Sequence, residues 1–539
     1  MIRRDFIRNI GVLGLTLAAT PILGANAKGS KSLLKQTKLT GFIKAAGKGL
    51  ANVTVTDGHL VVLTDNNGFY SFYANPKARF IHFAIPSGYK IPHQNSIAQF
   101  YGVINFNSEN HQTDFTLEKL TSSDEKHGFV VWADTQIQNQ RDSDLLLQNA
   151  APDLKALTAN YPANYLHGIG CGDLVWDNFN LFPDYKKAIS VSGLPFFNVI
   201  GNHDMDLDTR SDEGSTKTFE SHFGPTYYSY NRGKVHYVVL DDVFFVGVDK
   251  KYIGYITEDQ LNWLEQDLKY VKAGATIVVS LHIPTYTNQH KRNKVAEEMG
   301  GTVTNRQRLY NMLQGFQVHI MSGHTHFNEV IINKNITEHV HGTVCGAWWT
   351  GPICGDGTPR GYGVYEVNGS DIKWYYKSTE KEANHQLRIY PKGYAKAYPE
   401  EMAVNIWNWD AKWTIECFED GVSKGTPEQR VAKDPWAIEL YEGPSLPQKH
   451  KFIEPTLTEH LFFIQPSANA KSIKVKATDR FGKIGSTPKT ELSNPYDRIK
   501  TAMDYMKKRS SEQVVFSLYP TNTIELNCLI SPTLFDWVL

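Results

Sequence analysis

The central part of the chain alternates short apolar runs with longer stretches in which apolar residues recur every three or four positions. Continuous apolar runs are typical of strands in sheets that helices cover on their faces, because such strands are packed on both sides. After Thr257, apolar residues within 261–271 share one helical face, and Thr257 with Gln260 fits a capping box. We therefore expect an α/β layer architecture in this region. The expected strands are residues 129–133, 165–171, 196–200, 235–240, 276–281 and 318–322.

The regions on either side have a different pattern, in which short alternating segments are separated by Gly, Asn and Asp. Alternation at period two between turn residues is typical of a β-sandwich. On the N-terminal side the segments are residues 53–56, 60–63 and 69–72, and the piece TDNNGFYSF resembles a carboxypeptidase-regulatory-like module of immunoglobulin type. On the C-terminal side they are residues 404–407, 413–416 and 473–476.

These patterns divide the 539 residues into domains of ordinary size. We expect an Ig-like β-sandwich at 38–118, a central α/β domain at 119–380 and a second β-sandwich at 385–493. Residues 494–539 contain one expected helix at 495–508 and a tail of unassigned role.

The first residues predict an export signal at 1–27. Arg3 and Arg4 precede an apolar run at 10–24, which is too short to span a bilayer comfortably, and small residues follow it at Ala25 and Ala27. The string RRDFIR resembles a twin-arginine signal, and a Sec signal is the alternative. We expect an exported protein, periplasmic or extracellular, without a membrane span after signal cleavage.

Charge and cysteine content exclude some classes of function. Lys and Arg together number 56, as do Asp and Glu, and no basic run tracks a phosphate backbone, so we expect no nucleic-acid binding. The five cysteines have no CxxC spacing, which argues against a thiolate metal site. Cys345 and Cys354 could pair across a loop or remain separate buried thiols.

Polar residues follow five of the expected strands, at the ends where loops hold ligands in α/β sheets. Carboxylate, amide and imidazole groups are donors of intermediate softness, and this mixture suits Mn, Fe, Zn or Ni. The sequence therefore predicts a metal site at one edge of the sheets. The clusters are DTQ at 134–136, GD at 172–173, GNHD at 201–204, the single His282 and GHTH at 323–326.

These five elements, in this order, resemble the signature of the calcineurin-like metallophosphoesterases, which is D-x-H, GD, GNH[DE], H and GHxH. The resemblance implies a four-layer metallophosphoesterase sandwich covered by helices and flanked here by two Ig-like domains. It also implies two divalent or trivalent metal ions and hydrolysis of a phosphomonoester or diester, of a small molecule or a polymer. A hydroxide shared by the two metals would be the nucleophile.

Carried over residue by residue, the resemblance assigns a role to each motif position. His203 would protonate the leaving group or stabilise charge on the phosphoryl group, and Asp204 would orient His203 or cap the loop. Asp173 would bridge both metals. One metal would be held by Asp134, Gln136 and His326, and the other by Asn202, His282 and His324.

Two departures from the family pattern matter. Gln136 replaces the usual histidine, which changes the first metal position and leaves the others intact. The segment GDLVWDN lacks the GDxVDRG extension of Ser/Thr protein phosphatases, so a general phosphoesterase is favoured over a phosphoprotein phosphatase. The alternatives are a non-catalytic, metal-containing binding protein of the cell envelope and a hydrolase of carboxylic esters or amides at the same site.

Two residues beyond the motifs are candidate substrate contacts. Arg360 could bind a phosphate through two hydrogen bonds, and Trp349 could stack on a ring. The alternative is a surface arginine and a tryptophan at the edge of the core. Asp241 and Asp242 end a strand and either lie near the site or cap a turn.

Overall fold

The computed structural model describes residues 37–443, 446, 449–486 and 490–491. The expected export signal, the helix expected at 495–508 and the C-terminal tail lie outside these residues. Among the described residues, no helix is long and apolar enough to cross a membrane.

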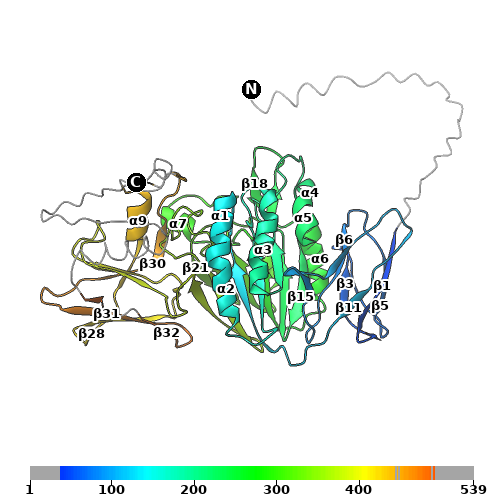
Figure 1. The fold of residues 1–539 in the computed structure, drawn as a ribbon, viewed down its shortest axis with the longest axis horizontal. Helices are drawn as coiled ribbons and strands as arrows, with labels where there is room; N and C mark the ends of the chain where they lie inside the picture. Colours follow the sequence, from blue (N-terminus) through cyan, green and yellow to red (C-terminus); the bar gives the residue numbers. More distant parts are fainter. Residues whose placement is uncertain (1–36, 444–445, 447–448, 487–489, 492–539) are drawn as a thin grey trace, which may run out of the picture. The chain divides into compact units, whose positions relative to one another are not determined.

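Two mixed sheets form the centre of the fold (Figure 1). The first contains, in order, β24 (Asp371–Ser378), β23 (Gly361–Asn368), β12 (Lys126–Trp132), β13 (Leu166–Cys171), β14 (Phe196–Val199), β8 (Ile97–Ala98) and β7 (His93–Gln94). The second contains β15 (Tyr228–Arg232), β16 (Val235–Val239), β19 (Thr276–Ser280), β20 (Gln317–Ser322), β22 (Ile336–Val340) and β21 (Glu329–Asn333).

All six strands expected in the central region are present, with ends that differ by three residues at most. β12, β13 and β14 run parallel to one another, and so do β16, β19 and β20. Parallel pairing brings the carboxyl ends of the strands in each sheet to one edge. A hairpin of β17 (Val243–Phe245) and β18 (Tyr252–Gly254) follows the second sheet's β16.

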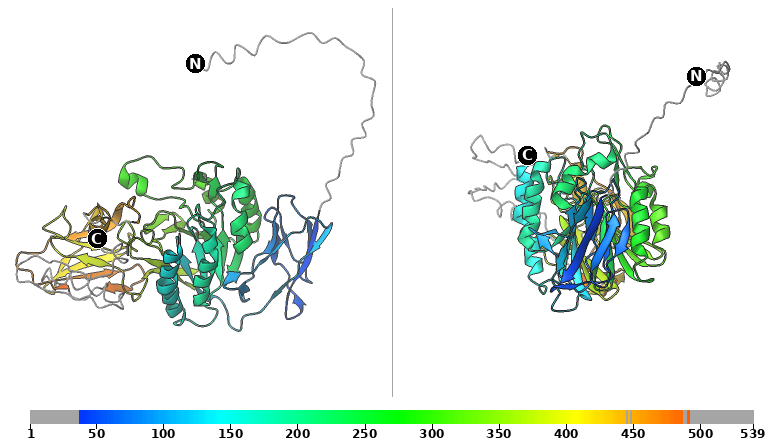
Figure 2. Two further views of the ribbon diagram at one scale, coloured as in Figure 1. Left: turned by 45° about the horizontal axis from the view of Figure 1, so that its top comes forward. Right: turned by 90° about the vertical axis from the view of Figure 1, so that its right-hand side faces the viewer.

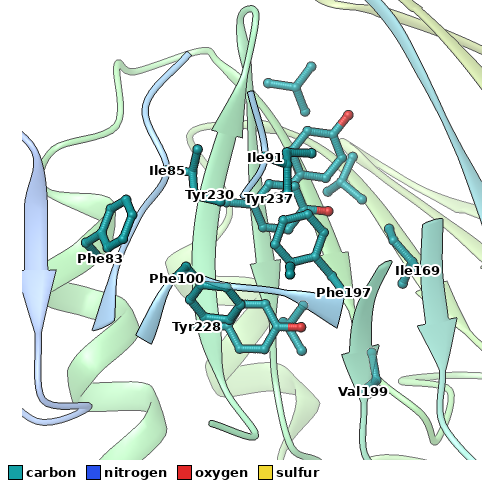
Figure 3. Packing of buried hydrophobic residues seen from close by; sticks show 14 of the residues in the cluster. Phe83, Ile85, Ile91, Phe100, Ile169, Phe197, Val199, Tyr228, Tyr230 and Tyr237 are labelled. Carbon is teal, nitrogen blue, oxygen red and sulfur yellow. The ribbon is translucent and has the colours of Figure 1, made fainter. Parts of the chain in front are cut away.

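Aromatic rings fill the space between the two sheets (Figure 3). Phe197 of the first sheet stacks on Tyr230 of the second, with ring centroids 3.6 Å apart, and Tyr230 stacks in turn on Tyr237 at 4.7 Å. Phe129 stacks on Tyr365 within the first sheet at 4.6 Å. Rings of this size contribute large buried areas, so this contact is a major source of the attraction between the sheets.

Helices cover the outer face of each sheet, which gives the expected four layers (Figure 2, right). One group packs on the first sheet: α1 (Gln140–Leu145), a π-helical turn (Leu146–Ala150), α2 (Ala151–Thr158) and α3 (Phe182–Ser192), with a 3-10 turn at Phe179–Leu181. The other group, α6 (Glu258–Leu268) and α8 (Arg306–Met312), packs on the second sheet. The shorter helices are α4 (Asp212–Ser215), α5 (Lys217–Phe223), α7 (Gln289–Asn293) and α9 (Pro435–Tyr441).

The capping box expected at the start of α6 does not form. The side chain of Gln260 accepts from the backbone N–H of Asp241 at 2.9 Å and donates to its carbonyl at 2.8 Å, and also reaches the Thr257 hydroxyl at 3.3 Å. Asp241 lies just beyond the end of β16, and the amide of Gln260 satisfies its buried backbone instead of the helix end.

The N-terminal region forms two small sheets, as its alternating pattern predicts. The first contains β1 (Lys38–Ala45), β2 (Lys48–Gly49), β5 (Phe69–Tyr73), β10 (Asn110–Gln112) and β11 (Phe115–Leu117). The second contains β3 (Thr54–Thr56), β4 (Val61–Leu63), β6 (Phe80–Phe83) and β9 (Tyr101–Val103). The region is less separate than expected, because β8 pairs with β14 and Phe100 contacts Phe197 at 5.9 Å.

The C-terminal region is also a pair of sheets around its own apolar core. β25 (Arg388–Tyr390), β26 (Met402–Asn405), β30 (Leu457–Ile464) and β29 (Glu428–Lys433) form one sheet. The other contains β28 (Val422–Gly425), β27 (Thr414–Glu419), β31 (Ser472–Thr478), β32 (Ile484–Ser486) and β33 (Thr490–Glu491). Asn328 donates to the carbonyl of Trp407 at 2.6 Å, and His460 contacts Asp356 at 3.1 Å, so this region is bonded to the loops that follow the last motif.

The buried histidine His127 makes stability depend on pH. Its Nδ1 donates to the carbonyl of Asp124 at 2.8 Å, so Nε2 of the neutral ring accepts from the hydroxyl of Tyr237 at 2.6 Å. Burial, with the nearby charge of Arg232, lowers the pKa of His127 to about 3. At pH 5 the unfolded chain therefore takes up a proton on this ring that the folded chain does not, which favours unfolding.

We predict that His127→Gln reduces the loss of stability between pH 7 and pH 5. The neutral amide keeps one donor and one acceptor but removes the proton uptake, which costs the native protein about 2 kcal/mol at pH 5 for an unfolded pKa of about 6.5. Urea denaturation of both proteins at the two pH values measures the difference. Equal losses in the two proteins would show that His127 does not carry this pH dependence.

Candidate metal centre

The motif residues lie in the loops that follow β12, β13, β14, β19 and β20. Backbone hydrogen bonds connect these loops: the N–H of Asp134 donates to Gly172 at 3.2 Å, that of Gln136 to Asp173 at 2.8 Å, and that of Gly323 to His282 at 3.0 Å. The loops are therefore bonded to one another, and their side chains are placed by a common framework.

Five of the seven expected ligand residues adopt the left-handed backbone conformation, with φ between 41° and 69°. This region is costly for residues other than glycine, by roughly 1–3 kcal/mol each, and persists only where the surrounding structure enforces it. Such a concentration of strain in one set of loops is typical of a functional site. The five are Asp134, Gln136, Asp173, His324 and His326.

The glycines of the motifs leave room for the ligand side chains. A Cβ on Gly201 would lie 2.3 Å from Oδ1 of Asp173, and one on Gly323 would lie 2.4 Å from Oδ2 of Asp134. Both separations are far below van der Waals contact, and the carboxylates could not stay where they are. The glycines in GNHD and GHTH are thus required by close approach to the two aspartates.

Asp173 lies at the middle of the cluster and is 1% exposed. Its Oδ1 is 3.3 Å from Nε2 of His282, which in turn is 3.2 Å from Oδ1 of Asn202 and 3.3 Å from Nδ1 of His324. The ligand atoms of Asp173, His282 and His324 all lie within 4.8 Å of one another, a spacing at which they could hold one metal ion. The expected second metal position is therefore assembled from four of these side chains.

The other oxygen of Asp173 faces the expected first metal position. Oδ2 accepts from Nε2 of Gln136 at 2.9 Å, while Oδ1 of Asp134 lies 3.4 Å from Nε2 of His326. Oε1 of Gln136 is buried and has no hydrogen-bond partner among the described residues. A buried oxygen without a partner is costly, and a cation beside it would satisfy it.

Each imidazole is held by one nitrogen so that the other faces the cluster. Nδ1 of His282 donates to the carbonyl of Cys171 at 3.1 Å, and Nε2 of His324 donates to that of Gly300 at 3.0 Å. Asp242 accepts from the backbone N–H of His282 at 3.0 Å, so it fixes this loop and does not enter the cluster. Hydrogen bonds of this kind set the tautomer of metal-binding histidines.

The charges in the cluster favour a cation. Burial alone would lower the pKa of His282, but the charge of Asp173 and the hydrogen bond to it raise the pKa to about 10. Burial would raise the pKa of Asp173, but His282 and His203 lower it below its ordinary value. The buried carboxylates of Asp134 and Asp173 thus require positive charge nearby. The oxygen and nitrogen donors around them fit divalent metal ions.

His203 lies beside the cluster and is oriented by Asp177. Its backbone N–H donates to Oδ1 of Asp173 at 2.9 Å, and its Nδ1 contacts Oδ1 of Asp177 at 2.9 Å. Burial lowers the pKa of His203, but the charge of Asp173 and the hydrogen bond to Asp177 outweigh it and raise the pKa. Lys250 donates to the second oxygen of Asp177 at 2.7 Å.

The orienting role considered for Asp204 falls to Asp177. Asp204 accepts from the backbone N–H groups of Leu174, Val175 and Gly201 at 2.9–3.1 Å, which is the loop-capping alternative. Asp177 is the sixth residue of GDLVWDN, and its position four residues after Asp173 is the only sequence signal that could have indicated it.

Trp349 does not have the position expected of a substrate contact. It is 1% exposed, and its indole N–H donates to the carbonyl of Thr135 at 2.8 Å. The guanidinium of Arg360 lies 5.0 Å from the centre of this buried ring. The neighbouring Trp348 faces the site instead and stacks on His326 with centroids 4.0 Å apart.

Three family models match the chain in order. The model described as the N terminal of calcineurin-like phosphoesterase matches residues 37–120, and that of calcineurin-like phosphoesterase itself matches 102–328. The model for the C terminal of calcineurin-like phosphoesterase matches 338–484. The middle match contains all seven expected ligand residues and His203.

Individual relatives are more distant. Purple acid phosphatase 15 of Arabidopsis thaliana is 26% identical over 170 residues, which are 29% of this chain and 28% of that protein, so the chain matches less than a third of that relative's length. A purple acid phosphatase from yellow lupin (Lupinus luteus) seeds has a TM-score of 0.34 at 13% identity, covering 61% of this chain and 67% of that one. A 5'-nucleotidase from Candida albicans has a TM-score of 0.29 at 14% identity, covering 48% and 51%. On the three family matches, the chain belongs to the calcineurin-like phosphoesterases, a family of phosphoester hydrolases.

Proposed function

We propose that this chain hydrolyses phosphoesters, monoesters or diesters, with two metal ions held on either side of Asp173. The observation that carries the proposal is the position of this one carboxylate. Its Oδ1 lies beside His282, and its Oδ2 lies beside Gln136, so each oxygen faces a different half of the ligand set. A carboxylate shared in this way supports a dinuclear site rather than a single ion.

Bound metal ions would polarise the phosphoryl group and lower the pKa of a water molecule enough to make it a nucleophile at neutral pH. The chain itself supplies the acid. Because Nδ1 of His203 is bonded to Asp177, Nε2 is the ring nitrogen left to face a substrate. The charge of Asp173 and the hydrogen bond to Asp177 raise the pKa of His203, which favours the protonated ring, so Nε2 could donate a proton to the leaving oxygen.

The substrate proposed here is a small phosphoester rather than a nucleic acid. The chain carries equal numbers of acidic and basic residues, so no overall field would attract a polyanion. Positive charge is found close to the cluster itself. Lys250, for example, lies 2.7 Å from the Asp177 carboxylate that contacts His203. Positive charge confined to the surroundings of the cluster suits a single phosphoryl group better than a chain of phosphates.

We predict that Asp173→Asn lowers both metal content and activity. A neutral amide in place of the shared carboxylate removes the charge that both metal positions need, so metal per chain falls from about two ions and hydrolysis falls at least about 100-fold. Elemental analysis and hydrolysis of p-nitrophenyl phosphate and its bis ester, after reconstitution with manganese or iron, measure the two effects. The exposed Asp371→Asn variant is the control, and it should keep both.

If the native chain takes up metal but hydrolyses neither ester, the proposed hydrolase function is contradicted. The non-catalytic binding protein considered as the alternative would then be favoured. Hydrolysis by Asp173→Asn at the native rate would remove Asp173 from the reaction centre.

We predict that His203→Ala lowers kcat about 10²–10⁴-fold while metal content is kept, because the ring acts on the leaving group and is not a ligand. Asp177→Asn should lower kcat by less, since the ring remains but loses the carboxylate that orients it. Lys250→Ala is the control: this side chain is 65% exposed, and exposed ion pairs contribute little, so kcat should stay within about threefold. A larger loss in Lys250→Ala than in Asp177→Asn would contradict the positioning role of Asp177.

A further inference from the structure

Four aromatic side chains form a continuous cluster, which we call the aromatic platform: Trp176, Trp348, His450 and Phe452. The ring of Phe452 lies 5.3 Å from Trp348, 5.4 Å from His450 and 6.2 Å from Trp176, measured between centroids. Trp176 lies 5.0 Å from His450. These separations and the tilted or edge-on arrangements are those that aromatic rings prefer.

The aromatic platform adjoins the metal centre on two sides. Trp176 is 5.4 Å from the ring of His203, and Trp348 stacks on the expected ligand His326 at 4.0 Å with an interplanar angle of 17°. Phe452 is therefore separated from the reaction centre by one ring on either path. A phosphoryl group bound beside His203 would bring the rest of its molecule next to the platform.

The platform is assembled from two domains and held by contacts on either side of its C-terminal rings. Trp176 belongs to the central match, whereas His450 and Phe452 lie in the C-terminal match. Lys449, next to His450, makes an ion pair with the buried carboxylate of Asp142 in α1 at 2.6 Å. On the other side Ile453, 4% exposed, packs into a core cluster with Ala347 and Tyr441. The segment that carries the two C-terminal rings is thus anchored at both ends.

One ring of the platform is open to solvent, and one buried ring nitrogen has no partner among the described residues. Phe452 is 56% exposed, although it adjoins three other rings. His450 is 9% exposed, and its Nε2 has no hydrogen-bond partner among the described residues. An exposed apolar ring within a cluster of rings, next to a reaction centre, fits a ligand that carries a ring of its own.

We propose that the aromatic platform binds the ring of an aromatic phosphoester, and that Phe452 determines specificity for such substrates. The inference rests on the proposed hydrolase function, because it places the phosphoryl group beside His203. A ring joining the platform gains edge and stacking contacts of the kind already present there, whereas a short alkyl group covers little of Phe452. Phe452 acts on binding and not on the chemical step.

Binding of two phosphonates, which have no ester bond to hydrolyse, tests the platform directly. We expect Phe452→Ala to weaken phenylphosphonate binding to the manganese-loaded protein about three- to tenfold and to leave methylphosphonate binding unchanged. Phe452→Trp should restore the preference for the phenyl compound. Phe106→Ala, which also removes a ring that is 43% exposed, is the matched control and should change neither affinity. Isothermal titration calorimetry measures all of these affinities.

Hydrolysis separates the failure of this inference from the failure of the proposed function. With p-nitrophenyl phosphate, Phe452→Ala should raise KM by a similar factor and leave kcat unchanged. Phe452→Ala could weaken the binding of both phosphonates equally, or of neither, while the native chain still hydrolyses p-nitrophenyl phosphate. In that case the ring-binding role of the platform is wrong and the proposed hydrolase function is unaffected. If the native chain hydrolyses no ester, the proposed function fails and the inference falls with it, even where phenylphosphonate binding depends on Phe452.

Discussion

The two central sheets pack against each other through a stack of aromatic rings, and the position of every ligand loop depends on that contact. Phe197 lies in β14, two residues before its end, and Tyr230 and Tyr237 lie in the two strands that begin the opposite sheet. Since the loops after β14 and β13 must meet those after β19 and β20, a shift of one sheet over the other would separate Asp173 from His282. The 3.3 Å contact between these two residues joins loops from different sheets.

Strand positions and the residues that follow them could be predicted because the underlying constraint is local. A strand buried on both faces must be apolar along its length, and a ligand loop must begin where the strand ends. The strained backbone of these loops was not predictable. Nothing in the sequence around Asp134 and His324 requires a positive φ. Their backbone conformation follows from the hydrogen bonds between the loops.

Side-chain direction in tight turns was the main point that sequence reasoning missed. Trp348 and Trp349 are adjacent and both have positive φ, yet one ring stacks on His326 and the other is buried against Thr135. Asp204 belongs to the GNHD motif, whereas Asp177 lies outside every motif, so the sequence directed attention to Asp204 and not to Asp177. Tertiary contacts decided which carboxylate reaches His203 and which accepts backbone N–H groups.

Gln136 is the position where the chain departs from the family pattern, and its geometry suits a ligand. The side chain is 2% exposed, its amide nitrogen contacts Asp173, and its oxygen is buried without a partner among the described residues. An amide oxygen is a weaker donor than imidazole for metals of intermediate softness, so the proposed first metal position would rely mainly on Asp134, His326 and the shared Asp173.

We propose that the carboxylate of Asp173 is shared by two metal ions. Anomalous diffraction from crystals of the manganese-loaded protein, recorded at the manganese edge, tests it most directly. We expect two peaks, one on each side of Asp173, with Gln136 beside the first and His282 beside the second. A single peak, or peaks that do not contact Asp173, would contradict it.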